Sequence, residues 1–319
     1  ESGDVYFDGC NVHVRSGEGS TRATPNGKGN LIIGYNEPPG SLMEVPKSAE
    51  GLEDTEAKKV EAVELDVSDS RGGSHNIIIG PEHEYTSFGG IVTGWRNQIS
   101  NEYSAVVGGY GNVASGYGST VTGGGYNEAS GRWSSISGGD GNSATGKYSS
   151  ISGGEYNTAS GSASSISGGE DNTASNYASS ISGGNDNTAS GSRSSISGGN
   201  YNKATEILSS ISGGEYNTAS NYASSISGGR YNTASGLSSS ISGGYENTAS
   251  GRYSSISGGR DNKASGWHSS VLGGKLNNAQ GEEAVVTGGL YNRAVGNLSS
   301  VVGGKRYKAK KRLSVVTGA

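Results

Sequence analysis

The four histidines are the side chains best suited to bind a metal or to transfer protons near neutral pH. They are His13, His75, His83 and His268, and they are scattered along the 319 residues without the spacing of metal ligands. Two of them have acidic neighbours in the sequence, Glu82 and Glu84. For these two histidines we expect a solvated loop rather than zinc coordination, so the sequence predicts no metal site.

Nucleophile and phosphate-binding motifs are also missing from this serine- and glycine-rich sequence. No Gly-x-Ser-x-Gly elbow accompanies a histidine and an acid, and no Gly-x-x-x-x-Gly-Lys-Ser loop occurs. Calcium-binding rolls repeat an Asp in every Gly-rich turn. Here the corresponding position varies: Tyr156, Asp171, Asp186, Tyr201, Tyr216, Tyr231, Glu246 and Asp261. We therefore predict no enzyme activity and no cofactor.

Aromatic side chains at turn positions are better candidates for recognition. Six of them follow a recurring Gly or Asn position: Trp133, Tyr148, Tyr177, Tyr222, Tyr253 and Trp267. Such rings stack on sugars or on a protein partner, and they also pack between subunits. We take them as candidate ligand contacts or intersubunit contacts.

A strict repeat must position these side chains. Nine copies of Ser-Ser-Ile-Ser-Gly-Gly run from Ser134 to Gly259, each starting 15 residues after the last. The predicted core column is Ile136, Ile151, Ile166, Ile181, Ile196, Ile211, Ile226, Ile241 and Ile256. The predicted hydrogen-bonded ladder is Asn142, Asn157, Asn172, Asn187, Asn202, Asn217, Asn232, Asn247 and Asn262. An Ala column lies two residues after the Asn column, and the apolar column extends back to Ile91 and forward to Val316.

Each repeat reads as two short strands joined by two turns. The residues around Ile151 and Asn157 alternate with period two, whereas the many glycines argue against helix. Glycines four residues after Asn, such as Gly146 and Gly161, predict turns with positive φ. Stacked in register, the repeats predict an all-β solenoid, a parallel β-roll of about 18 coils with 14- to 15-residue repeats.

The predicted core is thin, because the second inward position of the first strand is Gly in most coils, for example Gly153, Gly168 and Gly183. One coil buries too little apolar surface to offset the entropy of ordering its residues. We therefore expect the array, the Asn ladder and partner chains to stabilise the fold.

Four zones are predicted along the chain. Residues 1–29 are N-terminal cap strands; 30–80 are the first apolar coils with an inserted loop at 38–73; 81–304 are the regular roll; and 305–319 are a basic final coil or junction. The insertion, most acidic at 44–69, is predicted as a short helix near 49–63 or a solvated loop. The lone Cys10 is predicted to be buried. A net charge of −5 and the absence of a long apolar run predict no nucleic-acid partner and no direct membrane insertion.

The repeat motif resembles a known family. Asn30-Leu31-Ile32-Ile33-Gly34, Asn76-Ile77-Ile78-Ile79-Gly80 and the later Ser-x-Ile-x-Gly-Gly-x-x-Asn-x-Ala-x-Gly units are similar to the head repeats of YadA-type trimeric autotransporter adhesins. The resemblance implies a left-handed parallel β-roll and a side-by-side homotrimer. It also implies an extracellular place on a bacterial cell surface or surface fibre, with attachment to a host or neighbouring cell surface, to matrix proteins or to glycans.

A second hypothesis rests on the hydroxyl columns. Ser150, Ser152 and their repeats form a flat outward ladder. Such a ladder suits an ice-binding protein, or a passive extracellular structural or fibre protein such as a phage-type tail fibre.

Overall fold

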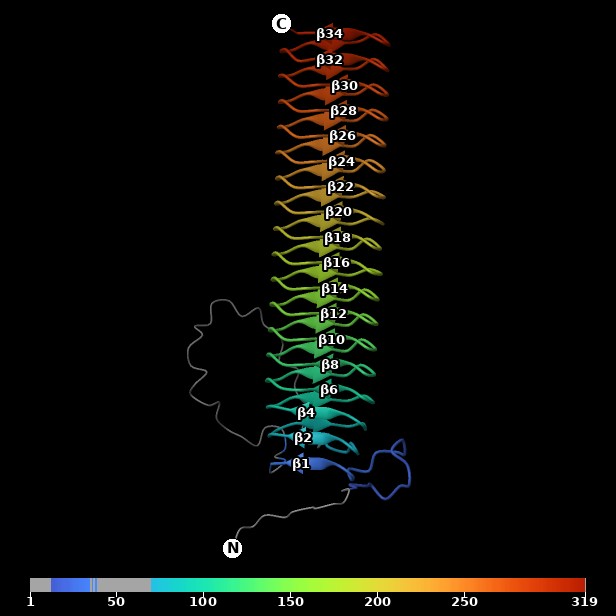
Figure 1. The fold of residues 1–319 in the computed structure, drawn as a ribbon, viewed down its shortest axis with the longest axis vertical. Coiled ribbons are helices and arrows are strands. Elements are labelled where there is room, and N and C mark those ends of the chain that lie inside the picture. Colours follow the sequence, from blue (N-terminus) through green and yellow to red (C-terminus); the bar gives the residue numbers. More distant parts are fainter. Residues whose placement is uncertain (1–12, 35, 37, 39–69, 319) are drawn as a thin grey trace, which may run out of the picture. The chain divides into compact units, whose positions relative to one another are not determined.

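The computed structural model describes residues 13–34, 36, 38 and 70–318, which fall into two compact units, residues 1–133 and 134–319 (Figure 1). The predictions for Cys10, for the first cap stretch near residues 4–7 and for the 44–69 insertion lie outside the described residues. Residues 13–29 are described and contain no strand, so this part of the predicted cap is not made of strands.

Unit 1 contains two stacks of short parallel strands. The first stack is β1 (Leu31–Ile33), β2 (Ile77–Ile79), β4 (Ile91–Thr93), β6 (Ala105–Val106) and β8 (Thr120–Val121). The second stack is β3 (Glu84–Tyr85), β5 (Gln98–Ile99), β7 (Val113–Ala114) and β9 (Glu128–Ala129). Successive coils therefore add one strand to each stack.

Unit 2 repeats this arrangement with greater regularity. Its first stack is β10 (Ser135–Ile136), β12 (Ser150–Ile151), β14 (Ser165–Ile166), β16 (Ser180–Ile181), β18 (Ser195–Ile196), β20 (Ser210–Ile211), β22 (Ser225–Ile226), β24 (Ser240–Ile241), β26 (Ser255–Ile256), β28 (Ser270–Val271), β30 (Val285–Val286), β32 (Ser300–Val302) and β34 (Val315–Thr317). Its second stack is β11 (Ser143–Ala144), β13 (Thr158–Ala159), β15 (Thr173–Ala174), β17 (Thr188–Ala189), β19 (Lys203–Ala204), β21 (Thr218–Ala219), β23 (Thr233–Ala234), β25 (Thr248–Ala249), β27 (Lys263–Ala264), β29 (Asn278–Ala279), β31 (Arg293–Ala294) and β33 (Lys308–Ala309).

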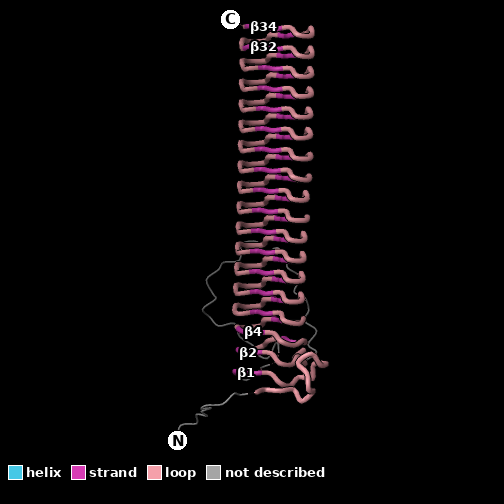
Figure 2. The backbone as a smooth tube through the Cα atoms, turned by 45° about the vertical axis from the view of Figure 1, so that its right-hand side comes forward, coloured by secondary structure: helices cyan, strands magenta, loops and turns pink. Residues whose placement is uncertain are grey.

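The chain is an all-β parallel β-solenoid of about 16 turns, with no helix among the described residues (Figure 2). About 18 coils are predicted from the sequence. The difference arises because β1 and β34 are not accompanied by a strand of the second stack. Pairing is in register, as Ser150 opposite Ser165 and Ile151 opposite Ile166 illustrate.

Four inward columns fill the solenoid. The nine predicted Ile side chains are each 1% exposed, and the Ala and Asn columns beside them are equally buried. The fourth column is the first Ser of each Ser-Ser-Ile unit, such as Ser149, which is fully buried. The sequence analysis does not identify this Ser column, although its 15-residue spacing is as regular as that of Ile.

The register of the first coils differs from the prediction. Ile91 was assigned to the core column, but it is 37% exposed, whereas Val92 is fully buried. Ile91 pairs with Ala105 and Val92 pairs with Val106. This coil has 14 residues, and a shift of one residue turns a strand side chain to the opposite face.

The two glycine predictions also need correction. A Cβ built on Gly153 would meet no atom within 4 Å, so this position does not face a packed core. A Cβ on Gly161 would collide with the carbonyl oxygen of Asn176 in the next coil, and the φ of Gly161 is not positive. Glycine is needed there because adjacent turns approach closely. The positive φ angles lie instead at Gly154 (+90°) and two residues beyond the Gly/Asn position, as at Ala163 (56°).

Candidate functional site

The two turns of each coil form two ridges beside the strands of unit 2, visible as the protruding loops in Figure 1. Ridge one joins the first strand to the second and consists of residues 140–141, 155–156 and their repeats to 305–306. Ridge two joins the second strand to the next coil and consists of residues 147–148, 162–163 and their repeats to 312–313. These ridges carry the side chains that vary between repeats, so they are the surfaces able to discriminate between ligands.

The predicted aromatic candidates occupy exposed turn positions. Trp133 belongs to unit 1, and the other five lie on ridge two; their exposed fractions lie between 41% and 53%. In unit 1, Trp133 is the end of a chain of edge-to-face rings formed with Phe88, Tyr103 and Tyr117, whose centroids are 5.1 to 5.8 Å apart. One face of Trp133 therefore contacts the chain itself.

The structure brings two of the six aromatics together with a cation. The Arg252 guanidinium lies 4.9 Å from the Tyr253 ring centroid and 5.3 Å from the Trp267 centroid. His268 stacks on Tyr253 at 4.9 Å with an interplanar angle of 21°. We call Arg252, Tyr253, Trp267 and His268 the Arg252 cluster. It combines planar apolar surface with an always-charged guanidinium, which suits stacking on a sugar ring and pairing with an anionic group.

Other ridge-two aromatics are more dispersed. Lys147 lies 4.8 Å from the Tyr148 ring, and Arg193 lies 5.9 Å from the Tyr177 ring. Tyr222 lies several coils from either pair. The aromatic candidates therefore do not form one continuous platform.

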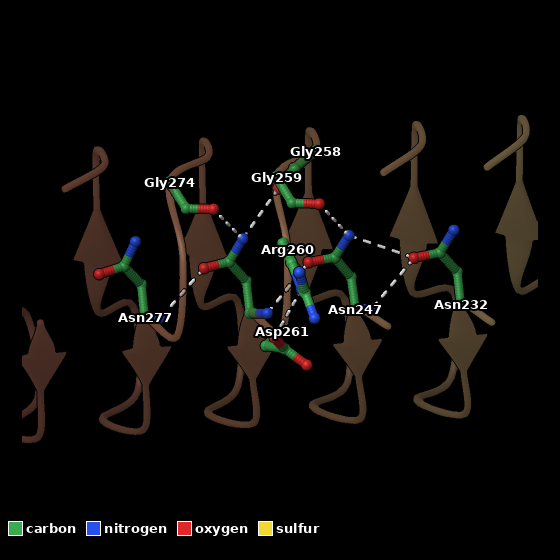
Figure 3. A network of polar contacts seen from close by, with 9 residues as sticks. Asn232, Asn247, Gly258, Gly259, Arg260, Asp261, Gly274 and Asn277 are labelled. Carbon is green, nitrogen blue, oxygen red and sulfur yellow. Dashed lines mark hydrogen bonds and ion pairs between the residues drawn. The ribbon is translucent and has the colours of Figure 1, made fainter. Parts of the chain in front are cut away.

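The predicted Asn ladder is a structural network rather than a binding site. Asn247 Oδ1 accepts a hydrogen bond from the backbone N–H of Asn262 at 3.0 Å. Asn247 Nδ2 donates to the carbonyls of Gly243 (3.1 Å) and Gly259 (3.0 Å) and to Asn232 Oδ1 (3.1 Å), as Figure 3 shows in part. The side chain thus joins the Gly-pair turns of successive coils. It bonds mainly to backbone groups, whereas the sequence predicts only a bond between like Asn side chains.

His83 is the one predicted loop residue that the structure places in the core. It is 1% exposed and stands 14 residues before Asn97, in line with the Asn column. Nε2 lies 3.0 Å from the Ile79 carbonyl, and Nδ1 accepts from the Asn97 N–H at 3.2 Å, which defines the neutral tautomer. Burial lowers the pKa of His83, only partly opposed by its hydrogen bonds to backbone groups. The prediction of a solvated loop is wrong here because imidazole can replace the Asn amide in the ladder.

Next to His83, Glu82 is 1% exposed and pairs with Arg96. This hydrogen bond is the main cause of the raised pKa of Arg96. Its role is to keep a buried carboxylate paired. Within the described part of the chain, no group of three His, Cys, Asp or Glu side chains is arranged to hold a metal ion. The same residues contain no helix able to cross a membrane.

Ridge one carries an aromatic stack that spacing alone does not reveal. Tyr201 and Tyr216 stack with centroids 4.7 Å apart and an interplanar angle of 3°, and Tyr216 and Tyr231 stack at 5.0 Å and 10°. All three rings are exposed. Every 15th residue from Asp140 to Lys305 lies beside this series, and the charges in that column are the signal that could have drawn attention to ridge one.

Comparisons with known proteins add no family assignment. The sequence matches no protein-family model, and a search of curated proteins likewise finds no match. The parallel β-roll is thus established by the structure, and the likeness to adhesin heads rests on the repeat motif.

Proposed function

We propose that this chain is a non-enzymatic, extracellular adhesin head or fibre segment on a bacterial cell surface. It attaches to cell surfaces, matrix proteins or glycans as a side-by-side homotrimer. The observation that carries this proposal is the Arg252 cluster, an exposed pair of aromatic rings with a guanidinium within 5.3 Å of both centroids. Exposed aromatic rings cost hydration free energy in a free protein and are typical of recognition surfaces.

The Arg252 cluster favours a glycan with an acidic group. The indole of Trp267 offers a flat face to the C–H side of a sugar ring, and Arg252 can donate two parallel hydrogen bonds to a carboxylate. A rigid solenoid holds both groups on adjacent turns, which lowers the entropy lost on binding.

The trimer is supported by the outward side of the first strands in unit 1. Leu31 and Ile33 of β1, Ile77 and Ile79 of β2 and Ile91 of β4 are between 37% and 54% exposed. These strands pair in register, so their outward side chains form one apolar surface. Copies of the chain placed in parallel would bring this surface to the same level in every subunit and remove it from water.

Binding to a glycan and matrix-protein array tests the proposal. We expect the full chain to bind acidic glycans and the Trp267→Ala variant to bind at least tenfold more weakly, because one stacked ring is lost. Tyr222→Ala is the matched control, since it removes an aromatic ring from ridge two outside the Arg252 cluster. Absence of binding to every glycan, matrix protein and cell surface, or equal binding by Trp267→Ala, would contradict the proposal.

A second candidate function is ice binding by the hydroxyl columns. In nine consecutive coils, Ser occupies the outward position before the core Ile and again after it, as Ser150 and Ser152 do. Their regular spacing favours ordered water on a flat face. Thermal hysteresis that is lost in a Ser180→Lys/Ser195→Lys variant would support this function, whereas an unshifted freezing point of the full chain would exclude it.

A further inference from the structure

The outer column of ridge one in unit 2 sorts its charges by sign. Its residues form parallel bridges from coil to coil and all remain accessible to solvent. In order they are Asp140, Glu155, Glu170, Asn185, Asn200, Glu215, Arg230, Tyr245, Arg260, Lys275, Leu290 and Lys305. Every acidic member precedes Arg230, and every basic member stands at Arg230 or later. The column thus has an acidic half and a basic half on a single rigid edge.

The centre of ridge one is aromatic. Tyr201, Tyr216 and Tyr231 form the stack described above, with exposed fractions of 41%, 38% and 39%. Tyr231 also lies 4.9 Å from the Arg230 guanidinium. Exposed tyrosines at the centre of a surface with charges towards its ends are the usual arrangement of a protein interface.

Reversing the ridge on itself pairs the two halves. A two-fold axis between the coils of Glu215 and Arg230 places Glu215 opposite Arg230 of a second copy. The same axis places Glu170 opposite Lys275 and Asp140 opposite Lys305. A parallel, in-register alignment would instead place each charge opposite its own kind.

The neighbouring column of the ridge, one residue later in each coil, is compatible with the same axis. It places Tyr216 opposite Tyr231 and Tyr156 opposite Tyr291, so rings meet rings. The one acidic contact is Asp186 opposite Asp261, and Arg260 Nε already donates to Asp261 Oδ2 at 3.2 Å within the chain. That ion pair neutralises the carboxylate at this position.

We propose that ridge one of unit 2 is a self-recognition surface that binds ridge one of a second copy of this chain in antiparallel orientation. The axis passes between Tyr216 and Tyr231, and the interface is isologous, since each half contacts the other half of its partner. The ridge is about 50 Å long at the spacing of stacked strands. It presents about two dozen residues, which matches the size of a stable interface of roughly 20 to 30 residues a side.

This surface is separate from those used in the proposed function. The Arg252 cluster lies on ridge two, and the apolar surface proposed for the trimer lies on the first strands of unit 1. Antiparallel pairing would therefore add a further association step to whatever assembly the chain forms. Its test measures that step and does not depend on a ligand.

Charge reversal at one facing pair gives a sharp test by sedimentation velocity over a range of concentrations. Glu170→Lys puts Lys opposite Lys twice in each pair of chains, and Lys275→Glu puts Glu opposite Glu twice. We expect each variant alone to associate at least about tenfold more weakly than the unmodified chain, because like charges face each other. An equimolar mixture of the two variants restores opposite charges at both positions, and we expect it to recover the original affinity. The Lys203→Glu variant, with the same charge change on the exposed second strand β19, should associate as the unmodified chain does.

Orientation is tested by disulfide formation in a Cys10→Ser background. Glu155 of one chain faces Leu290 of the other, so we expect a mixture of Glu155→Cys and Leu290→Cys to form a mixed disulfide. Neither variant alone should cross-link to itself. Self-cross-linking of Glu155→Cys would show a parallel arrangement and overturn the proposal. A mixture of Glu170→Lys and Lys275→Glu that associates no better than either variant alone would overturn it as well.

Discussion

At the scale of single residues, the buried Asn column stabilises the turns as well as the strands. Asn172 Oδ1 accepts from the Asn187 backbone N–H at 3.1 Å, and Nδ2 donates to the carbonyls of Gly168 (3.3 Å) and Gly184 (2.8 Å). Backbone groups of three coils thus depend on one amide, and each would be buried without a partner if that amide were removed.

Removal of this amide should therefore be costly. We expect Asn172→Ala to lower the free energy of unfolding by about 3 kcal/mol, since buried backbone donors and acceptors lose their partners. Urea denaturation followed by circular dichroism measures the change. Thr173→Ala, which changes the adjacent outward side chain, should stay within about 0.5 kcal/mol of the unmodified chain. Equal effects of the two substitutions would show that the ladder is not the stabilising element.

His83 makes the first coils sensitive to acid. Its pKa is lowered in the folded chain by burial, so the unfolded chain binds the proton more readily. The stability that neutral His83 contributes is therefore complete above its ordinary pKa of about 6.5 and is lost as the pH falls below that value. We expect the amide of Asn97, which donates to His83 Nδ1, to exchange with solvent faster at pH 5.5 than at pH 7.5, relative to amides of unit 2. His83→Asn restores the residue type of the column and should remove this pH dependence.

At the scale of the turn, close packing decides where glycine is required. The turn after the second strand brings backbone against backbone in the next coil, as at Gly161, whereas the first Gly of each Gly pair faces open space, as at Gly153. Where Asn replaces Gly, the turn changes locally. The Asn176 N–H donates to Ser179 Oγ at 3.2 Å, whereas the Gly161 N–H donates to the Ala174 carbonyl. Some coils can therefore accept a side chain at a measurable cost.

Two glycine substitutions separate close packing from backbone freedom. Gly161→Ala should destabilise unit 2 by about 1 to 3 kcal/mol, because its methyl group would overlap a backbone carbonyl that cannot rotate away. Gly153→Ala should be neutral or stabilising by about 0.5 kcal/mol, because it only restricts the unfolded chain. Thermal unfolding of both variants measures the difference. A larger loss for Gly153→Ala would mean that the first Gly of the pair is the constrained one.

At the scale of the whole molecule, repetition converts weak coils into a stable array and leaves its lateral surfaces available for partners. A coil contributes one Ile or Val, one Ala, one Asn and one Ser to the interior, so each coil is stabilised mainly by its neighbours in the stack. Cooperation along the stack does not cover the apolar outward side chains of β1, β2 and β4. Their burial requires a further chain.

The proposed trimer can be dissociated without disturbing the coils. Ile79 is 39% exposed and points away from the buried Ile78, so we expect Ile79→Lys to leave the circular dichroism spectrum unchanged and to shift the assembly towards monomer. Light scattering coupled to size-exclusion chromatography measures the mass. Gln98→Lys, an outward change on β5, is the control and should preserve the assembly. An unmodified chain that is folded and strictly monomeric would refute the trimer.

Much of this solenoid was predictable because its period is short and unbroken. An apolar column every 15 residues, with hydroxyl residues on either side, admits few structures other than stacked short strands. The prediction fails at Ile91, where one coil is a residue shorter, and at His83, where an unlike side chain takes the place of Asn. Single-sequence periodicity is least informative at such breaks, because a shift of one residue exchanges inside and outside.

The sequence by itself determined the parallel solenoid and the identity of the buried Ile, Ala and Asn columns, since strict repetition places like residues above one another. Only the tertiary structure decided which turn glycines face backbone, that Ser149 and its repeats are interior, and that Arg252 lies between the rings of Tyr253 and Trp267. It also decided that the charges from Asp140 to Lys305 share one edge. These features depend on distances between residues of different coils, and the backbone path through the turns decides those distances.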